Sequence, residues 1–119
     1  MEAMTDKNFI WLVFDSIRGD RTSIGGHDRE TTPTLEAIGA EPDGIAGTCF
    51  AHAIWSQPSV ASMMTGTYPS MHGSGSYNEV LPAEIPTVAQ RLSDGGYHTI
   101  GVSSNPYFSA TTGTDRGFD

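Results

Sequence analysis

Two features of this sequence have an evident chemical use: a serine placed before a predicted helix and an acid at the end of an apolar run. Ser56 opens residues 56–66, which should form a helix, and Asp15 directly follows the apolar residues 9–14. A serine at a helix N-terminus can attack a phosphorus or sulfur centre when a cation stabilises its alkoxide and helix amides receive the remaining oxygens. A carboxylate fixed at a strand end can ligate such a hard cation. The pair indicates ester hydrolysis on an anionic group.

Each candidate residue also has an ordinary structural interpretation. Asp15 could equally cap the turn that follows it, and a serine placed like Ser56 is usually only a helix N-cap. His72, in the loop after the helix, could donate to a leaving group or to the anion, although a lone loop histidine is more often solvated. Arg18 and Asp20 could form a local pair near Asp15, on an exposed face.

Three segments are predicted to be the strands that would position these residues. They are residues 9–14, 48–55 and 97–102. The first is continuously apolar rather than alternating, which is typical of a strand covered on both faces of a parallel sheet. Ligands bind beyond the carboxyl ends of strands in such sheets, where Asp15 would lie.

Three helices are predicted between and after these strands. Their expected bounds are residues 32–39, 56–66 and 86–95, because proline and N-cap residues open them and glycines stop them. Residues 67–86 are rich in Gly, Ser, Pro and Tyr and lack a clear period, so we expect a long surface loop. Alternating strands and helices imply an α/β fold, a three-layer sandwich with a mostly parallel sheet.

The composition limits the size and the partners of the protein. With 119 residues, 37% of them hydrophobic, we expect one domain or part of one. Six basic against fourteen acidic residues give a net charge of -8, which argues against a general nucleic-acid surface and against anionic membranes. Lys7 is the only lysine and the acids are spread along the chain, a pattern that a salt-rich cytoplasm would favour.

The single cysteine gives no indication of redox chemistry, and the N-terminal segment suggests a cytoplasmic location. Cys49 has no second cysteine to pair with, and its apolar neighbours predict a buried, inert thiol. Residues 1–7 are polar, and the apolar run behind them is too short for a signal-peptide core or a membrane span. We therefore expect no membrane partner.

Taken together, five ordered motifs resemble the N-terminal part of the sulfatase family, within the alkaline-phosphatase-like superfamily. They are FDSIRGD at 14–20, TPTL at 32–35, WSQPS at 55–59, TGTYPSMHG at 65–73 and GGYHT at 95–99. Each motif alone is weak, whereas their order is specific. The resemblance implies an alkaline-phosphatase-like fold for this chain.

The resemblance also implies roles for the candidate residues. Asp15 and Ser56 would be ligands of a divalent metal ion, and Ser56 would occupy the nucleophile position, where many sulfatases carry a cysteine converted to formylglycine. His72 would steady the anion. Sulfate-cleaving members look dependent on calcium or magnesium, while phosphate-cleaving relatives use zinc or manganese with Ser or Thr.

Three departures from the family pattern matter. The modification pattern Cys-x-Pro-x-Arg has Ser56 in its first place and Val60 in its last, so an unmodified serine is the simpler hypothesis. Ser16 replaces the second aspartate of the acid pair, and residues 103–106 stand where many sulfatases have Gly-Lys-Trp-His. We interpret residues 1–119 as the N-terminal portion of one sulfatase-like domain, to be completed by a missing C-terminal half or by another chain.

Three functions stay open on the sequence. The leading one is metal-assisted hydrolysis of small sulfuric esters with Ser56 as the nucleophile. The second is a phosphodiesterase or phosphoglycerol-transferase-like enzyme that uses an unmodified serine. The third is a non-catalytic fragment, because Asp15 and Ser56 alone offer few ligands for a tight metal site.

Overall fold

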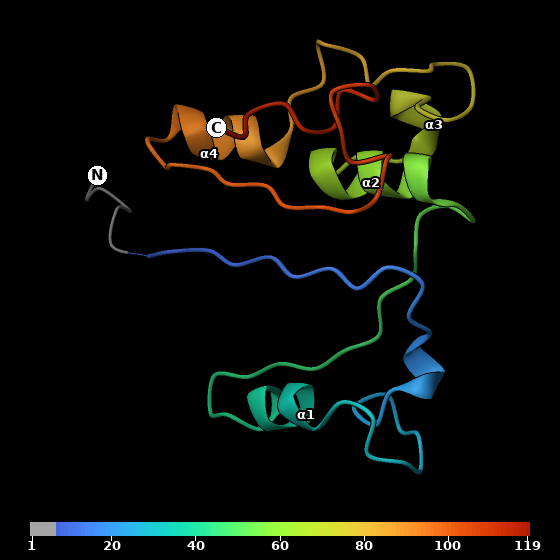
Figure 1. The fold of residues 1–119 in the computed structure, drawn as a ribbon, viewed down its shortest axis with the longest axis vertical. Coiled ribbons are helices and arrows are strands. Elements are labelled where there is room, and N and C mark those ends of the chain that lie inside the picture. The colour runs from blue at the N-terminus through green and yellow to red at the C-terminus, as the bar shows by residue number, and fades with distance from the viewer. Residues whose placement is uncertain (1–6) are drawn as a thin grey trace. The chain divides into compact units, whose positions relative to one another are not determined.

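Short helices joined by long extended segments make up the computed structural model, which describes residues 7–119 (Figure 1). In chain order they are η1 (Gly19–Arg21), α1 (Pro33–Gly39), α2 (Ser56–Thr65), α3 (Pro69–His72) and α4 (Val88–Asp94). The polar N-terminal segment considered above lies outside the described residues, apart from Lys7.

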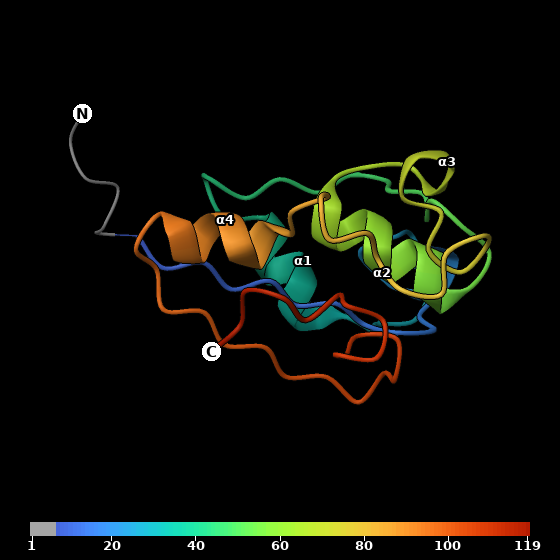
Figure 2. The ribbon, with the colours of Figure 1, turned by 90° about the horizontal axis from the view of Figure 1, so that it is seen from above.

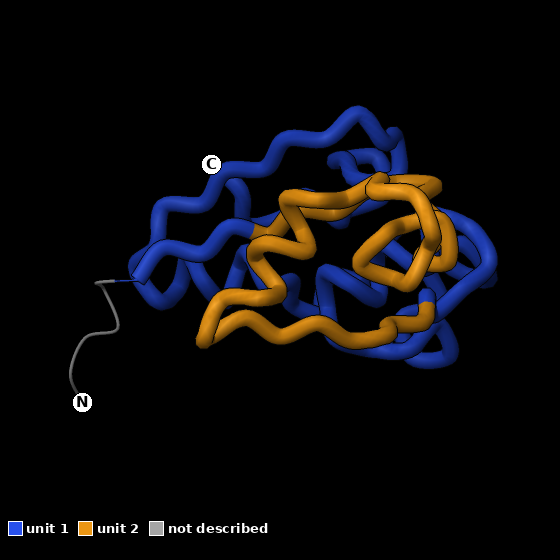
Figure 3. Tube along the Cα trace, turned by 90° about the horizontal axis from the view of Figure 1, so that it is seen from below, with its two compact units in different colours: residues 1–10, 51–119 blue, residues 11–50 orange. Residues whose placement is uncertain are grey.

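The chain divides into two compact units, which Figure 3 colours separately. The larger one, called the main unit below, comprises Met1–Ile10 and Ala51–Asp119 and contains α2, α3 and α4. The small unit, Trp11–Phe50, contains η1 and α1. Ser56 and His72 therefore belong to the main unit, and Asp15 belongs to the small unit.

The three predicted helices are confirmed, with bounds close to those expected. α1 has Pro33 in its first turn, where a missing backbone N–H costs nothing. α2 begins at Ser56 and ends before Gly66, whose left-handed conformation (φ 67°) forms the C-cap. α4 begins after Thr87, whose side chain accepts the N–H of Gln90 in a capping box.

The segment predicted as a surface loop, residues 67–86, is more structured than expected. It contains α3, with Pro69 in the first turn and Gly73 as a left-handed C-cap at φ 62°. His72 and Leu81 within it are buried, at 0% and 2% exposure. Contacts with α2 order this segment, so the prediction of a solvated loop is wrong for its central part.

A small hydrophobic core joins α2 to α4 in the main unit. Val60 and Met64 of α2 pack with Ala89 of α4, and Phe108 and Phe118 lie against this cluster. Figures 1 and 2 show the C-terminal segment that carries the two phenylalanines running near these helices. The rings of Phe108 and Phe118 meet edge to face, with centroids 5.4 Å apart. This packing holds α2, and with it Ser56, in place.

The predicted parallel sheet is not confirmed. Apart from an isolated bridge between Ser74 and Asn78, residues 7–119 contain no strand. The segments expected to be strands run extended or bent instead, and Ile10 and Val102 are 94% and 93% exposed. A strand forms only when a neighbouring strand at the ladder spacing accepts and donates its backbone hydrogen bonds. The apolar side chains that would lie inside the sheet are therefore at the surface.

Two further findings bear on the expectations above. Cys49 is exposed rather than buried, because it lies in an extended stretch that no other segment covers. None of the helices in residues 7–119 is both long and apolar enough to span a membrane.

Candidate active site

Ser56 is the first residue of α2 and is half-buried. The preceding residue, Trp55, is extended, with φ -148° and ψ 167°. No side chain caps the helix, and within residues 7–119 the Ser56 hydroxyl makes no hydrogen bond. The structure thus does not use Ser56 as an N-cap, the commonest role for serine at a helix start.

The first turn of α2 offers backbone N–H groups that no carbonyl inside the helix can accept. Ser56 and Gln57 each carry such an N–H, whereas Pro58 has none and the N–H of Ser59 is the first that a helix carbonyl accepts. Together with the positive end of the helix dipole, these groups favour an anion beside Ser56.

The residues on both sides of Ser56 are held by the segment that follows α3. The side-chain Nε2 of Gln57 donates to the carbonyl of Glu79 at 2.8 Å and to the Ser74 hydroxyl at 3.3 Å. Gly75, at φ 78°, packs so closely that a Cβ there would lie 2.8 Å from both Pro58 and Trp55. The backbone around Ser56 is therefore fixed by direct packing.

Trp55 has a second contact, with the C-terminal part of the main unit. Its indole meets the ring of Tyr107 edge to face, with centroids 5.4 Å apart. The carbonyl of Tyr107 accepts the hydroxyls of Thr112 and Thr114 at 2.8 and 2.9 Å. A hydrogen-bonded turn thus supports the aromatic contact next to Ser56.

His72 is fully buried, and both of its ring nitrogens form hydrogen bonds with other residues of the chain. Nε2 lies 2.9 Å from the Ser62 hydroxyl, and Nδ1 accepts the backbone N–H of Ser74 at 3.0 Å. Burial lowers the pKa of His72 below its ordinary value of 6.5, and the nearby charge of His52 lowers this pKa further. His72 is therefore neutral at physiological pH.

A side chain that contacts a bound anion must be accessible to it, whereas His72 is buried. The His72 ring has 0% exposure, so in this structure no substrate atom can reach it. His52, whose ring stacks edge to face on Tyr68 with centroids 5.5 Å apart, is the exposed histidine of this region. Contact between His72 and substrate stays a prediction that would require the loop after α3 to open.

Asp15 lies in an exposed turn of the small unit. Ser16 follows it with a left-handed backbone (φ 60°), which is strained for a residue with a side chain, and its hydroxyl donates to the Asp15 carboxylate at 3.3 Å. Asp15 and Ser56 belong to different units, so their meeting around one metal ion stays a prediction.

The expected pair of Arg18 and Asp20 is confirmed. Two hydrogen bonds of 3.0 and 2.6 Å join the guanidinium to the carboxylate, and both side chains are exposed. The hydrogen bond to Arg18 lowers the pKa of Asp20, and the same hydrogen bond raises the pKa of Arg18. Exposed pairs of this kind contribute little to stability.

The described residues do not by themselves form a metal site. Nowhere in residues 7–119 do three or more His, Cys, Asp or Glu side chains gather closely enough to hold an ion. Asp15 can supply one carboxylate, and Ser16 beside it offers only a neutral hydroxyl. A tight divalent site needs several oxygen ligands, so a metal site that includes Asp15 would need further ligands.

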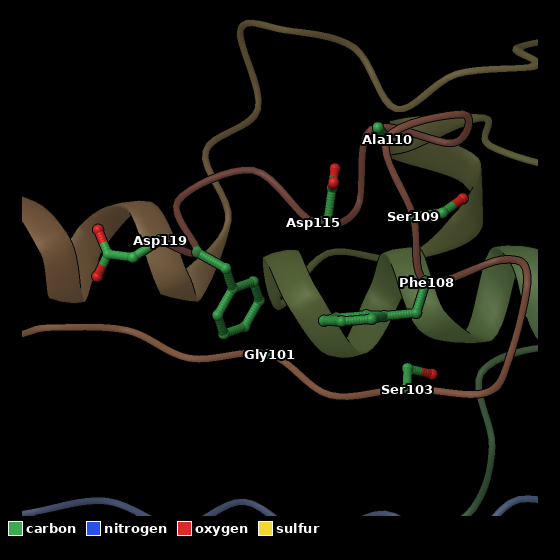
Figure 4. Close-up of a pocket in the computed structure, with 8 residues that line it drawn as sticks. Gly101, Ser103, Phe108, Ser109, Ala110, Asp115 and Asp119 are labelled. Atoms are coloured by element: carbon green, nitrogen blue, oxygen red, sulfur yellow. The ribbon is translucent and has the colours of Figure 1, made fainter.

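A hollow of about 360 Å³ lies in the main unit, away from the predicted site residues (Figure 4). Its lining includes Phe108, Phe118 and the carboxylate-bearing Asp115 and Asp119. Asp119 accepts the backbone N–H of Thr99 at 2.8 Å, so this carboxylate is engaged inside the chain. None of the residues predicted for catalysis or metal binding lines the hollow.

Comparison with known proteins identifies the chain. The family model described as Sulfatase matches residues 7–119. The chain belongs to the sulfatase family. An arylsulfatase from Clostridium perfringens (strain 13 / Type A) is 30% identical over 97 residues, which is 77% of this chain and 19% of that relative. The chain thus spans about a fifth of the length of this relative. No solved structure matches the chain.

Membership of the sulfatase family confirms the resemblance drawn from the ordered motifs, including its N-terminal position. It implies an alkaline-phosphatase-like fold and, for the family in general, a divalent metal ion. The sheet of that fold is not formed in residues 7–119, and the identity of the metal is not fixed by the match.

Sequence reasoning missed three residues that support Ser56 in the structure. Gln57, Ser62 and Ser74 are buried and hydrogen-bonded, at 8%, 2% and 0% exposure. Ser62 lies two residues from both Val60 and Met64 and so faces away from their side of the helix, which leaves no local sequence signal for its burial.

Proposed function

We propose that this chain carries the nucleophile segment of a sulfatase-family hydrolase, in which Ser56 attacks the sulfur of a sulfuric ester. The supporting observation is the state of Ser56: it opens α2, half-buried, and its hydroxyl is engaged by no hydrogen bond within the described residues. The name of the Clostridium perfringens relative, an arylsulfatase, suggests aryl sulfates as the substrate class.

The proposed chemistry is a displacement at sulfur. The Ser56 oxygen forms a bond to sulfur while the bond from sulfur to the ester oxygen breaks. The hydroxyl proton passes to solvent, the leaving oxygen takes up a proton, and water then hydrolyses the sulfated serine. The N–H groups of the first turn of α2 stabilise the oxygens of the transferred group.

A divalent ion, calcium or magnesium, is the proposed cofactor, with Asp15 and Ser56 among its ligands. Family membership supports the ion, and the strained turn at Asp15 and Ser16 is the kind of backbone feature that clusters at functional sites. The ion would lower the cost of forming the Ser56 alkoxide. Titration of the 119-residue chain and of Asp15→Asn with each metal tests this ligand; equal affinities would exclude Asp15.

A phosphate ester is the second candidate substrate, favoured by the environment of Val60. This residue takes the last place of the formylglycine modification pattern, where arginine is expected, and it is 8% exposed in the core with Met64 and Ala89. Ser56 takes the place of the cysteine that is modified. An unmodified serine fits phosphodiester cleavage or phosphoglycerol transfer, with zinc or manganese as the ion.

The test compares hydrolysis of para-nitrophenyl sulfate, para-nitrophenyl phosphate and a bis-para-nitrophenyl phosphate, with each metal present. We expect Ser56→Ala to lower hydrolysis of the accepted ester by about 10³-fold or more, because the nucleophile is removed. Ser93→Ala is the matched control, since Ser93 is exposed on α4. Equal rates in wild type and Ser56→Ala would reject Ser56, and no hydrolysis by wild type would favour a non-catalytic segment.

A further inference from the structure

A chain of buried hydrogen bonds connects the second turn of α2 to its first turn through the loop after α3. The Ser62 hydroxyl bonds Nε2 of His72 at 2.9 Å, and Nδ1 of His72 accepts the N–H of Ser74 at 3.0 Å. The Ser74 hydroxyl accepts from Gln57 at 3.3 Å, and Gln57 also donates to the carbonyl of Glu79 at 2.8 Å. We call Gln57, Ser62, His72 and Ser74 the buried network.

We propose that the buried network positions Ser56, with His72 acting as a neutral imidazole that carries its proton on Nε2. The inference rests on the proposed function, in which Ser56 is the nucleophile. It makes His72 a positioning residue that acts through α2, in place of a group that touches the substrate.

The hydrogen-bond pattern fixes the tautomer of His72. Because the Ser74 N–H points at Nδ1, that nitrogen must present its lone pair, and the single ring proton must lie on Nε2. Nε2 then donates to the Ser62 oxygen. A second proton, on Nδ1, would face the Ser74 N–H in a site that has 0% exposure to bulk solvent.

The buried network contacts α2 at two positions along the helix axis. Gln57 lies in the first turn and Ser62 in the second, and a helix rises about 1.5 Å per residue, so the contacts are more than one turn apart. A single contact would let the helix rotate or tilt about it, whereas the two contacts, with His72 and with Ser74, oppose both motions. Ser56 precedes Gln57 directly, so its backbone is fixed with that residue.

Complete pairing of the polar groups makes this arrangement specific. Among the described residues, no buried side-chain nitrogen or oxygen lacks a hydrogen-bond partner. A fully satisfied buried network stabilises one geometry, because any shift leaves a donor or acceptor unpaired away from water. The close packing of Gly75 on Trp55 and Pro58 fixes the same turn from the outside.

The first arm of the test is the tautomer of His72, read from the ¹⁵N chemical shifts of its ring in the 119-residue chain at neutral pH. We expect a protonated Nε2 and an unprotonated Nδ1. A ring protonated on Nδ1, or on both nitrogens, would overturn the proposal. This arm uses the wild-type chain, so it holds even if a variant fails to fold.

The second arm measures the mobility of Ser56 by its backbone ¹⁵N order parameter. We expect it to fall from about 0.85, typical of rigid backbone, to below about 0.6 in Ser62→Ala. Met64→Ala is the matched control, because it removes a core side chain of the same helix and leaves the network intact. An equally rigid Ser56 in Ser62→Ala, or equal loosening in Met64→Ala, would overturn the positioning role.

Both arms are independent of turnover. If Ser56→Ala hydrolyses esters as fast as wild type, the proposed nucleophile is wrong even though the His72 tautomer and the rigidity of Ser56 are as expected. If Ser56→Ala is inactive and Ser56 is equally rigid in wild type and Ser62→Ala, the nucleophile stands and the positioning role fails.

Discussion

His72 has the most restrictive environment of the candidate residues, because its complete burial disfavours the charged form of the ring. Its pKa is about 6.5 in an unfolded chain and is lowered by burial in the folded one. The folded state therefore binds the proton less readily, and stability is highest above about pH 6.5 and falls as the pH drops through the folded-state pKa.

We expect this linkage to appear in urea unfolding between neutral and mildly acidic pH. The contribution of His72 to the free energy of unfolding should fall by at most about 1.4 kcal/mol per pH unit. His72→Gln lacks the titrating group, so the difference between its profile and that of wild type isolates the histidine from the carboxylates. Parallel profiles would show that the ring accepts a proton without cost.

Cys49 gives a second prediction at the residue scale. Its neighbours Phe50 and Ala51 predicted burial, yet the thiol is exposed because no other segment covers this stretch. Since it is the single cysteine, a thiol reagent reports on it alone. We expect Ellman's reagent to react with the folded chain nearly as fast as with the urea-unfolded chain. Protection that disappears only in urea would place Cys49 in the interior.

At the scale of elements, two hydrogen bonds of the Thr87 hydroxyl fix the start of α4. The Thr87 hydroxyl accepts the N–H of Gln90 and donates to the carbonyl of Arg116 at 2.5 Å, and Thr87 is fully buried. We expect Thr87→Ala to lower the free energy of unfolding by about 1–3 kcal/mol, since a cap and a buried hydrogen bond are lost.

Thr87→Ser is the control for this prediction, because it keeps the hydroxyl. It should cost about 1 kcal/mol or less for the missing methyl group. Chemical denaturation of both variants measures the difference. Equal losses in Thr87→Ala and Thr87→Ser would mean that packing, and not the cap, fixes the start of α4.

The helices could be predicted because their signals are local. Pro33 opens α1, and Gly66 closes α2 with a left-handed backbone that a residue without a side chain adopts freely. α3 was missed although Pro69 and Gly73 give it the same kind of start and stop, because it is only one turn long. Among glycines and serines, a single turn has no hydrophobic period to detect.

The site could be predicted only as far as single residues. The position of Ser56 at the start of α2 followed from Pro58 and Gly66, whereas the bond between Ser62 and His72 depends on how α3 folds back onto α2. A strand likewise depends on its neighbour in space. The apolar pattern at residues 9–14 predicted that this segment can be buried. It did not indicate which neighbouring strand would pair with it.

At the scale of the whole molecule, the exposed apolar segments should make the chain self-associate. Ile10, Val102 and the other members of these extended segments expose large hydrophobic side chains and unpaired backbone. We expect light scattering to show oligomers that decrease when Ile10→Lys and Val102→Lys are combined. Asn8→Lys, at an already exposed polar residue, should leave the association unchanged. A monomeric wild type would contradict this.

The two proposed metal ligands lie in different compact units. Asp15 belongs to the small unit and Ser56 to the main unit, and residues 7–119 gather no cluster of three ligands. The proposed nucleophile segment is thus ordered within one unit, while the proposed metal site would need ligands besides Asp15 and Ser56. This division agrees with a chain that spans about a fifth of its arylsulfatase relative.

Attack by the Ser56 oxygen on the ester is the central claim, and trapping the covalent intermediate tests it most directly. Reactions with aryl sulfate and aryl phosphate are quenched rapidly and the peptides sequenced by tandem mass spectrometry. We expect a sulfate or phosphate group on Ser56, absent from Ser56→Ala, with Ser59 and Ser62 unmodified. Turnover that proceeds with the group on another residue, or equally fast in Ser56→Ala, would contradict the claim.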